Sequence, residues 1–203
     1  MITTVGTVPP GRGVPVTLQA MAAPSSLPFD PVEEAARKWS ARWEDADAMA
    51  VATSIMRVQQ LLLGRIEAAL RPLQLTFARY EALVLLCFSR NGSLPMSKMG
   101  QRLMVHPTSI TNIVDRLQTQ QFIRREPHPT DRRTTLVAIT DAGREVTERA
   151  TAALVEVRFA LEALDPEQMK TLYDLLRDVR LHAGDFPADE HSATWPNAFL
   201  PPT

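Results

Sequence analysis

The chain has 203 residues, of which 45% are apolar and 22% are charged, and its formal net charge is −1. This length and apolar content suit one globular domain with an appendage, and they exclude a disordered chain. Because the net charge is close to zero, any site for a polyanion such as nucleic acid must come from a local concentration of basic residues.

Cysteine and histidine usage excludes several kinds of site. The single cysteine, Cys87, cannot form an internal disulfide or a cysteine-based zinc site, and the four histidines show no spacing typical of metal ligands. We therefore expect no metal and no cofactor. No run of about 18 apolar residues and no secretory signal pattern is visible, which indicates a cytoplasmic protein without a membrane segment.

The N-terminal part of the chain changes character at Asp30. Residues 1–29 are rich in Pro, Gly, Ser and Thr and predict a flexible extension. Asp30 is a typical N-cap and Pro31 a typical first helical residue, so a helix is expected to begin there. A longer helix is expected from about Asp47 until Pro72 ends it.

The middle of the chain predicts three further helices. Thr76 is a plausible cap for a helix to Phe88, and residues 90–95 are expected to form a loop. Ser97 is a plausible cap for a short helix through Leu103, and Pro107 suits the first turn of another that runs to about Gln120. The last two helices, joined by a tight connection, have the outline of a helix-turn-helix.

The helix from Pro107 has two different faces. Its apolar residues recur at intervals of three and four, which directs them to a core; they are Ile110, Ile113, Val114 and Leu117. The remaining arc is polar and is made of Thr108, Ser109, Thr111, Asn112, Asp115 and Arg116. A helix with such an arc can present short polar side chains to a partner.

The segment that follows predicts a β-hairpin and two more helices. Strand-forming residues 122–126 and 135–139 flank a proline-containing loop with adjacent arginines, Arg132 and Arg133. Thr140 is expected to cap a long helix with apolar residues as far as Leu164, and the pattern restarts at Asp165-Pro166 with a last helix before a Pro-rich tail, residues 183–203.

Basic residues concentrate around this hairpin. Residues 98–134 hold seven Lys or Arg against three Asp or Glu, so this segment is positive in a slightly negative chain. An α-helix fits the DNA major groove, and a basic loop can enter the narrow, electronegative minor groove. Arg132 and Arg133 are therefore expected to bind DNA. Arg124 and Arg125 alternate on a strand, so at most one of them is expected to face phosphate.

The order helix, helix, hairpin is that of a winged helix-turn-helix, and one stretch resembles a known family. The segment "HPTSITNIVDRLQTQQFIRREPHPTDRRTTLVAITDAG", residues 106–143, is similar to the recognition helix and wing of the MarR family of transcription regulators. The wing of that family reads Asp-x-Arg, a strand, then Leu-Thr and a nearby Gly. These positions fall here on Asp131, Arg133, Ile139-Thr140 and Gly143, and the resemblance covers roughly residues 30–182.

The resemblance implies a fold that is mainly α with a small β-hairpin. It implies a DNA-binding lobe at about residues 76–140, flanked by dimerisation helices at about 30–71 and 141–182. A homodimer would place two recognition helices in successive major grooves of a pseudo-palindromic site. Arg133 would be the wing-tip arginine and Asp131 would shape the wing. The positions that would face DNA on the recognition helix are Pro107, Thr108, Ser109, Thr111, Asn112 and Arg116.

Two residues depart from the family pattern. Gln121 stands where the family usually has Gly before the wing, so we expect the turn there to be longer or differently shaped. Asn112 stands where many members have an arginine. Since Asn suits adenine edges and Arg suits guanine, the preferred base sequence is expected to differ.

The resemblance implies a ligand-responsive repressor that binds double-stranded DNA. Aromatic and phenolic acids are frequent effectors in that family, but the sequence assigns no effector-binding residue. A winged helix that binds only protein is the alternative, and no catalytic motif indicates an enzyme. Cys87 lies in an apolar helix without an adjacent cation, which favours an inert core thiol over a redox sensor. Trp39 and Trp43 favour helix packing over a ligand pocket.

Overall fold

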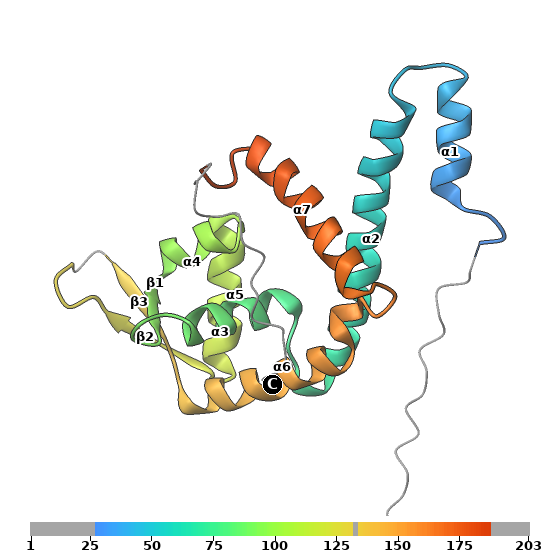
Figure 1. Ribbon diagram of the computed structural model, residues 1–203. Coiled ribbons are helices and arrows are strands. Elements are labelled where there is room, and N and C mark those ends of the chain that lie inside the picture. Colours follow the sequence, from blue (N-terminus) through green and yellow to red (C-terminus); the bar gives the residue numbers. More distant parts are fainter. Residues whose placement is uncertain (1–26, 132–133, 188–203) are drawn as a thin grey trace, which may run out of the picture. The chain divides into compact units, whose positions relative to one another are not determined.

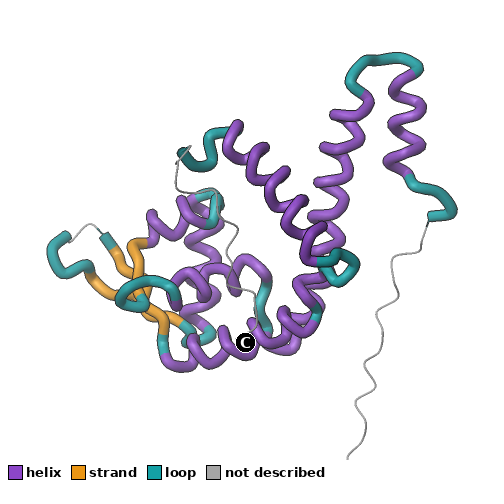
Figure 2. The backbone as a smooth tube through the Cα atoms, viewed as in Figure 1, coloured by secondary structure: helices purple, strands orange, loops and turns teal. Residues whose placement is uncertain are grey.

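The computed structural model describes residues 27–131 and 134–187, so that Arg132, Arg133 and both terminal segments lie outside the described residues. The described chain is mainly helical with one small sheet, as the sequence predicted (Figures 1 and 2). The elements are α1 (Pro31–Ser40), α2 (Ala46–Leu70), α3 (Phe77–Cys87), β1 (Ser93–Pro95), α4 (Met96–Arg102), α5 (Pro107–Thr119), β2 (Ile123–Pro127), β3 (Thr135–Ile139), α6 (Asp141–Glu156) and α7 (Pro166–His182), with 3-10 turns η1 (Arg71–Leu73) and η2 (Arg158–Ala160).

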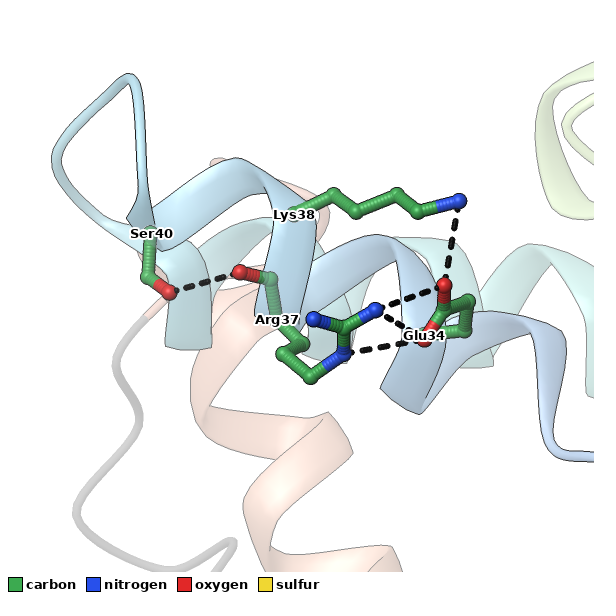
Figure 3. Close-up of polar contacts among 4 residues, drawn as sticks. All are labelled: Glu34, Arg37, Lys38 and Ser40. Atoms are coloured by element: carbon green, nitrogen blue, oxygen red, sulfur yellow. Dashed lines mark hydrogen bonds and ion pairs between the residues drawn. The ribbon is translucent and has the colours of Figure 1, made fainter.

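The chain divides into two compact units, residues 1–55 and 56–203. In the first unit, the Asp30 carboxylate caps α1 by accepting from the backbone nitrogens of Val32, at 2.8 Å, and Glu33, at 3.4 Å. The predicted start of this helix is therefore confirmed. Along α1, Glu34 pairs with Lys38 and Arg37, and these partners lower the pKa of its carboxyl group (Figure 3).

The two tryptophans of the first unit pack on each other. Their ring centroids lie 4.8 Å apart with a tilt of 56°, and the Trp39 indole nitrogen donates to the carbonyl of Glu44 at 2.8 Å. The sequence favoured packing between helices, whereas the contact observed here joins the two rings to each other. Trp43 nevertheless remains 58% exposed.

The core of the second unit lies where α3, α5 and α6 meet the sheet (Figure 1). Ile110, Val114 and Leu117 of α5 are buried, which confirms the inward stripe predicted for this helix. The largest of the other fully buried side chains in the core are Leu70, Leu83, Leu86, Met99, Ile123, Val137 and Leu154.

The sheet has three antiparallel strands in the order β1-β3-β2. Ile123 of β2 pairs with Ile139 of β3, and Leu94 of β1 pairs with Val137. The prediction that residues 90–95 form a loop is therefore wrong for Ser93–Pro95. Such a short segment carries little strand signal of its own, and β3 supplies the backbone partners that make it a strand.

Two helix boundaries also differ from the prediction. Ser97 lies inside α4, whose N-cap is Pro95 and has no side-chain capping bond. The long helix after Thr140 ends at Glu156. It cannot continue, because Arg158, Phe159 and Ala160 adopt positive φ values of 45°, 51° and 62°. This break buries Ala160 and packs Phe159 against the core, which apolar spacing along a helix could not predict.

The remaining caps agree with the sequence. Thr76 and Thr140 each cap the helix that follows, and Asp165 forms a capping box with Gln168 at the start of α7. Among the described residues, no helix is long and apolar enough to cross a membrane, and no three His, Cys, Asp or Glu side chains gather as metal ligands would.

Candidate DNA-binding interface

The outer face of α5 is polar and accessible. Of the predicted contact residues, Thr108, Ser109, Thr111, Asn112 and Arg116 are exposed on the arc opposite the buried stripe. Pro107 is the first residue of the helix, and His106 caps it by accepting from the Thr108 nitrogen at 3.3 Å. The proline φ and this cap define where the exposed arc begins.

A shallow hollow of about 500 Å³ lies on this arc and is lined by Thr108, Thr111, Asn112 and Asp115. The first three side chains offer hydroxyl and amide groups, which can donate to and accept from base edges. Asp115 is already engaged, because its carboxylate lies 2.6 Å from the Arg125 guanidinium. The hollow therefore presents neutral hydrogen-bonding groups at its accessible positions.

The two strand arginines are both paired, a feature that the sequence did not predict. Arg125 bonds Asp115 and, at 2.5 Å, the side-chain oxygen of Gln118, so it braces β2 against α5. Arg124 pairs with Glu126 at 2.5 Å. The two arginines have different partners, as expected for neighbouring residues of a strand that point to opposite faces. Each of them forms an ion pair within the protein.

The wing tip, residues 128–134, is closed by local hydrogen bonds in its described part. The Thr134 nitrogen donates to the Asp131 carbonyl at 3.0 Å, and the Thr134 hydroxyl donates to the Asp131 carboxylate at 2.6 Å. The His128 ring nitrogen accepts from the backbone nitrogens of Thr130 and Asp131 at 3.3 and 3.2 Å. Asp131 thus joins both sides of a turn whose predicted DNA-binding arginines, Arg132 and Arg133, lie outside the described residues.

The turn from α5 into the wing is a Schellman motif. The Phe122 nitrogen donates to the Leu117 carbonyl at 3.0 Å, and the Gln121 nitrogen donates to the Gln118 carbonyl at 2.9 Å. Gln121 has φ 63°, the left-handed conformation that glycine adopts most easily. The expectation of a longer or differently shaped turn is wrong, because Gln121 takes up the conformation that a glycine would have.

Gly143 shows why the wing pattern contains a glycine. The Thr140 hydroxyl accepts from the Gly143 nitrogen at 3.0 Å and donates to the Gln121 carbonyl at 2.8 Å. A Cβ atom on Gly143 would lie 2.1 Å from the Phe122 carbonyl oxygen. That oxygen also accepts from the Thr140 nitrogen at 3.0 Å, so it has little room to move. We call Gln121, Phe122, Thr140 and Gly143 the wing base.

A mostly apolar cleft of about 600 Å³ lies between α3 and α6, apart from the hollow on α5. Val84, Phe88 and Val155 line it together with Tyr80 and Thr151, whose hydroxyl groups are 3.1 Å apart. Cys87 also lines this cleft and is half-buried against the core, so its thiol is more accessible than the inert core position that the sequence favoured.

Comparison with known proteins gives a consistent result. The model of the MarR family matches residues 79–135, which extend from α3 to the start of β3. The chain is 54% identical to Sco5413, a MarR family transcriptional regulator from Streptomyces coelicolor, with a TM-score of 0.66. That match covers 70% of this chain and 99% of that one.

Two further similar structures each contain a bound molecule. Sco3205 from Streptomyces coelicolor, a MarR family regulator solved in complex with DNA, is 27% identical with a TM-score of 0.64, over 73% of this chain and 97% of that one. CouR from Rhodococcus jostii RHA1, solved with p-coumaroyl-CoA bound, is 27% identical with a TM-score of 0.58, over 68% of this chain and 94% of that one.

Proposed function

The chain belongs to the MarR family and is a DNA-binding transcription regulator, and we propose that it acts as a ligand-responsive repressor, a homodimer on a pseudo-palindromic operator. The observation that carries the proposal is the outer face of α5. There Thr108, Thr111 and Asn112 line one accessible hollow while the opposite face of the same helix is buried in the core. A rigid helix with such a face suits base-edge recognition in the major groove.

The roles of individual residues are part of this proposal. Asn112 reads a base edge, with a preference for adenine, and Thr108, Ser109 and Thr111 contact neighbouring bases or phosphates. Pro107 positions the start of the helix, and Arg116 contacts phosphate. Arg133 enters the minor groove beside Arg132, and Asp131 shapes the turn that presents both arginines, as its bonds to Thr134 support.

Exposed apolar side chains on the terminal helices support a homodimer. On α2 these are Val51, Ile55, Met56, Val58 and Leu61, and on α7 they are Leu172, Tyr173, Leu175 and Val179. A monomer would leave these side chains in water, and a second copy can bury them. Such a dimer would work in the cytoplasm, where Cys87 also stays reduced.

For the effector we propose a small aromatic acid or its thioester in the apolar cleft between α3 and α6. Val84, Phe88 and Val155 offer apolar contacts, and the Tyr80 and Thr151 hydroxyls can orient a polar group. The p-coumaroyl-CoA bound by the related CouR is chemistry of this kind. Effector binding would favour a dimer conformation with altered spacing of the two recognition helices.

The proposal is tested by fluorescence anisotropy with DNA from upstream of the protein's own gene and with a scrambled duplex, at several salt concentrations. We expect the operator to bind about a thousandfold more tightly than the scrambled duplex, with a salt slope of about −0.9 per phosphate contacted. Arg133→Ala should weaken operator binding, whereas Arg37→Ala, which removes an arginine from α1, should not.

Equal, weak binding to both duplexes with a flat salt response would refute the DNA-binding role. In that case the winged helix would serve a protein partner instead. Candidate aromatic acids are then added to the operator complex, and an effector should release the DNA. Substitution of Val84 by Asp in the cleft should abolish this release without abolishing DNA binding.

A further inference from the structure

A second polar hollow, of about 550 Å³, lies at the other end of the recognition helix. It is formed where η1, the start of α3 and the end of α5 come together, all within the second unit. Arg71, Arg79 and Arg116 line it with Glu67, so its charged groups are mainly positive. Sequence patterns did not single out Arg79, because it lies outside the helix-turn-helix segment.

Arg79 is held in place by neutral partners. Its guanidinium donates to the Thr76 hydroxyl at 3.2 Å and to the Gln120 side-chain oxygen at 3.1 Å, and Gln120 in turn donates to the Gln74 carbonyl at 3.1 Å. The side chain is half-buried. It is therefore preorganised, and hydrogen bonds rather than a counterion hold it.

Two of the three arginines that line this hollow, Arg79 and Arg116, repel each other. Burial lowers the pKa of Arg79, nearby Arg116 lowers it further, and Glu67 partly opposes them. Arg79 stays charged, since guanidinium groups do not lose their proton in proteins. Within residues 27–131 and 134–187, no carboxylate lies within ion-pair distance of either Arg79 or Arg116. Arg79 is preorganised, and it shares with Arg116 a hollow whose charged groups are mainly positive, so the hollow favours an oxyanion as ligand.

The hollow continues the DNA-facing arc of α5. Asn112 lines the first hollow, and Arg116 and Gln120, at successive intervals of four residues, line the second. Residues four apart lie above one another on a helix with a rise of about 6 Å. An oxyanion in the second hollow would thus lie along the same line as the bases proposed to meet Asn112.

We propose that Arg79 and Arg116 together clamp a backbone phosphate of the operator and so set the register of α5 in the major groove. This inference rests on the proposed function and adds Arg79, a residue of α3, to the DNA-binding surface. The clamp positions the protein on any duplex and reads no base. Arg79 is a positioning residue, and its loss affects all sequences alike.

The test uses the full chain and compares Arg79→Gln with the parent on operator and scrambled duplexes. Each protomer should lose about one phosphate contact, so the salt slope of a dimer becomes less negative by about 1.8. At about 0.15 M salt this corresponds to about thirtyfold weaker binding on both duplexes. Arg79→Lys, which keeps the charge, should retain the parental slope, and Arg37→Gln serves as the matched control on α1.

Three other outcomes would overturn the inference. If the parent discriminates the operator and Arg79→Gln matches it in affinity and slope, the phosphate clamp is absent although the regulator function stands. If the parent itself does not bind DNA, the function and the clamp fail together. If inorganic phosphate at millimolar concentration shifts the Arg79 side-chain NMR signal while the slope of Arg79→Gln is parental, the hollow holds a free anion instead of DNA. Thermal unfolding of each variant separates a binding loss from misfolding.

Discussion

The base and the tip of the wing are built in different ways. At the wing base, Gly143 packs against the Phe122 carbonyl and Thr140 bonds both sides of the junction, next to the buried Ile123 and Ile139. At the wing tip, Asp131 and Thr134 are bonded to each other at the surface. Close packing thus specifies the wing base, whereas hydrogen bonds at the surface specify the wing tip. Because the tip is exposed, charged side chains can be placed there to contact a ligand.

The largest effect should follow from filling the space at the base. Gly143→Ala would place a methyl group 2.1 Å from a hydrogen-bonded carbonyl oxygen, so either α6 or β2 must move. We expect a loss of about 3 kcal/mol in the free energy of unfolding. Urea unfolding followed by circular dichroism measures it, with the exposed Ala142→Gly as control. A loss below about 1 kcal/mol would show that the junction adapts.

A smaller effect of opposite sign is expected at Gln121. The left-handed conformation of Gln121 costs about 1–2 kcal/mol for a residue with a side chain. A glycine would remove this strain, but it would also raise the conformational entropy of the unfolded chain, which offsets part of the gain. Gln121→Gly should therefore stabilise the protein by about 0.5–1 kcal/mol without changing DNA affinity. Thermal unfolding and anisotropy on the same sample check both statements. Destabilisation would mean that the Gln121 side chain contributes contacts that outweigh the strain.

The smallest effect on stability is expected at the wing tip, where the consequence should be functional. Asp131→Ala removes an exposed hydrogen bond and should change the free energy of unfolding by less than about 0.5 kcal/mol. Charge alone predicts tighter DNA binding, because an acid is removed. If Asp131 shapes the turn, binding should weaken severalfold instead, while Asp131→Asn, which can still accept from Thr134, should bind at least as well as the parent. Tighter binding by Asp131→Ala would rule out the shaping role.

Prediction from sequence succeeded where the cause is local. Asp30, Thr76 and Thr140 were each predicted to cap a helix, and each side chain accepts from a backbone nitrogen within three residues. The stripe on α5 was also predictable, because burial of every third or fourth residue follows from helix geometry. The family resemblance rested on the same stretch, since the wing pattern is contiguous in sequence.

Prediction failed where the cause is distant in sequence. Ser93–Pro95 becomes a strand only because β3 lies beside it, more than 40 positions along the chain. The end of α6 depends on the packing of Phe159 and Ala160. The candidate site shows the same division: Asn112 and its neighbours could be selected from one helix, whereas Arg79 faces Arg116 only through the packing of α3 on α5.

The sequence alone determined the helix caps, the two-faced recognition helix, the wing and its family, because each depends on groups a few residues apart. The tertiary structure decided the third strand, the break after α6, the left-handed Gln121 and the pairing of Arg125 with Asp115. It also brought Arg79 and Arg116 to one hollow. These features depend on which elements pack together in the folded unit. Burial and hydrogen bonding across the whole unit, and not within one segment, determine that packing.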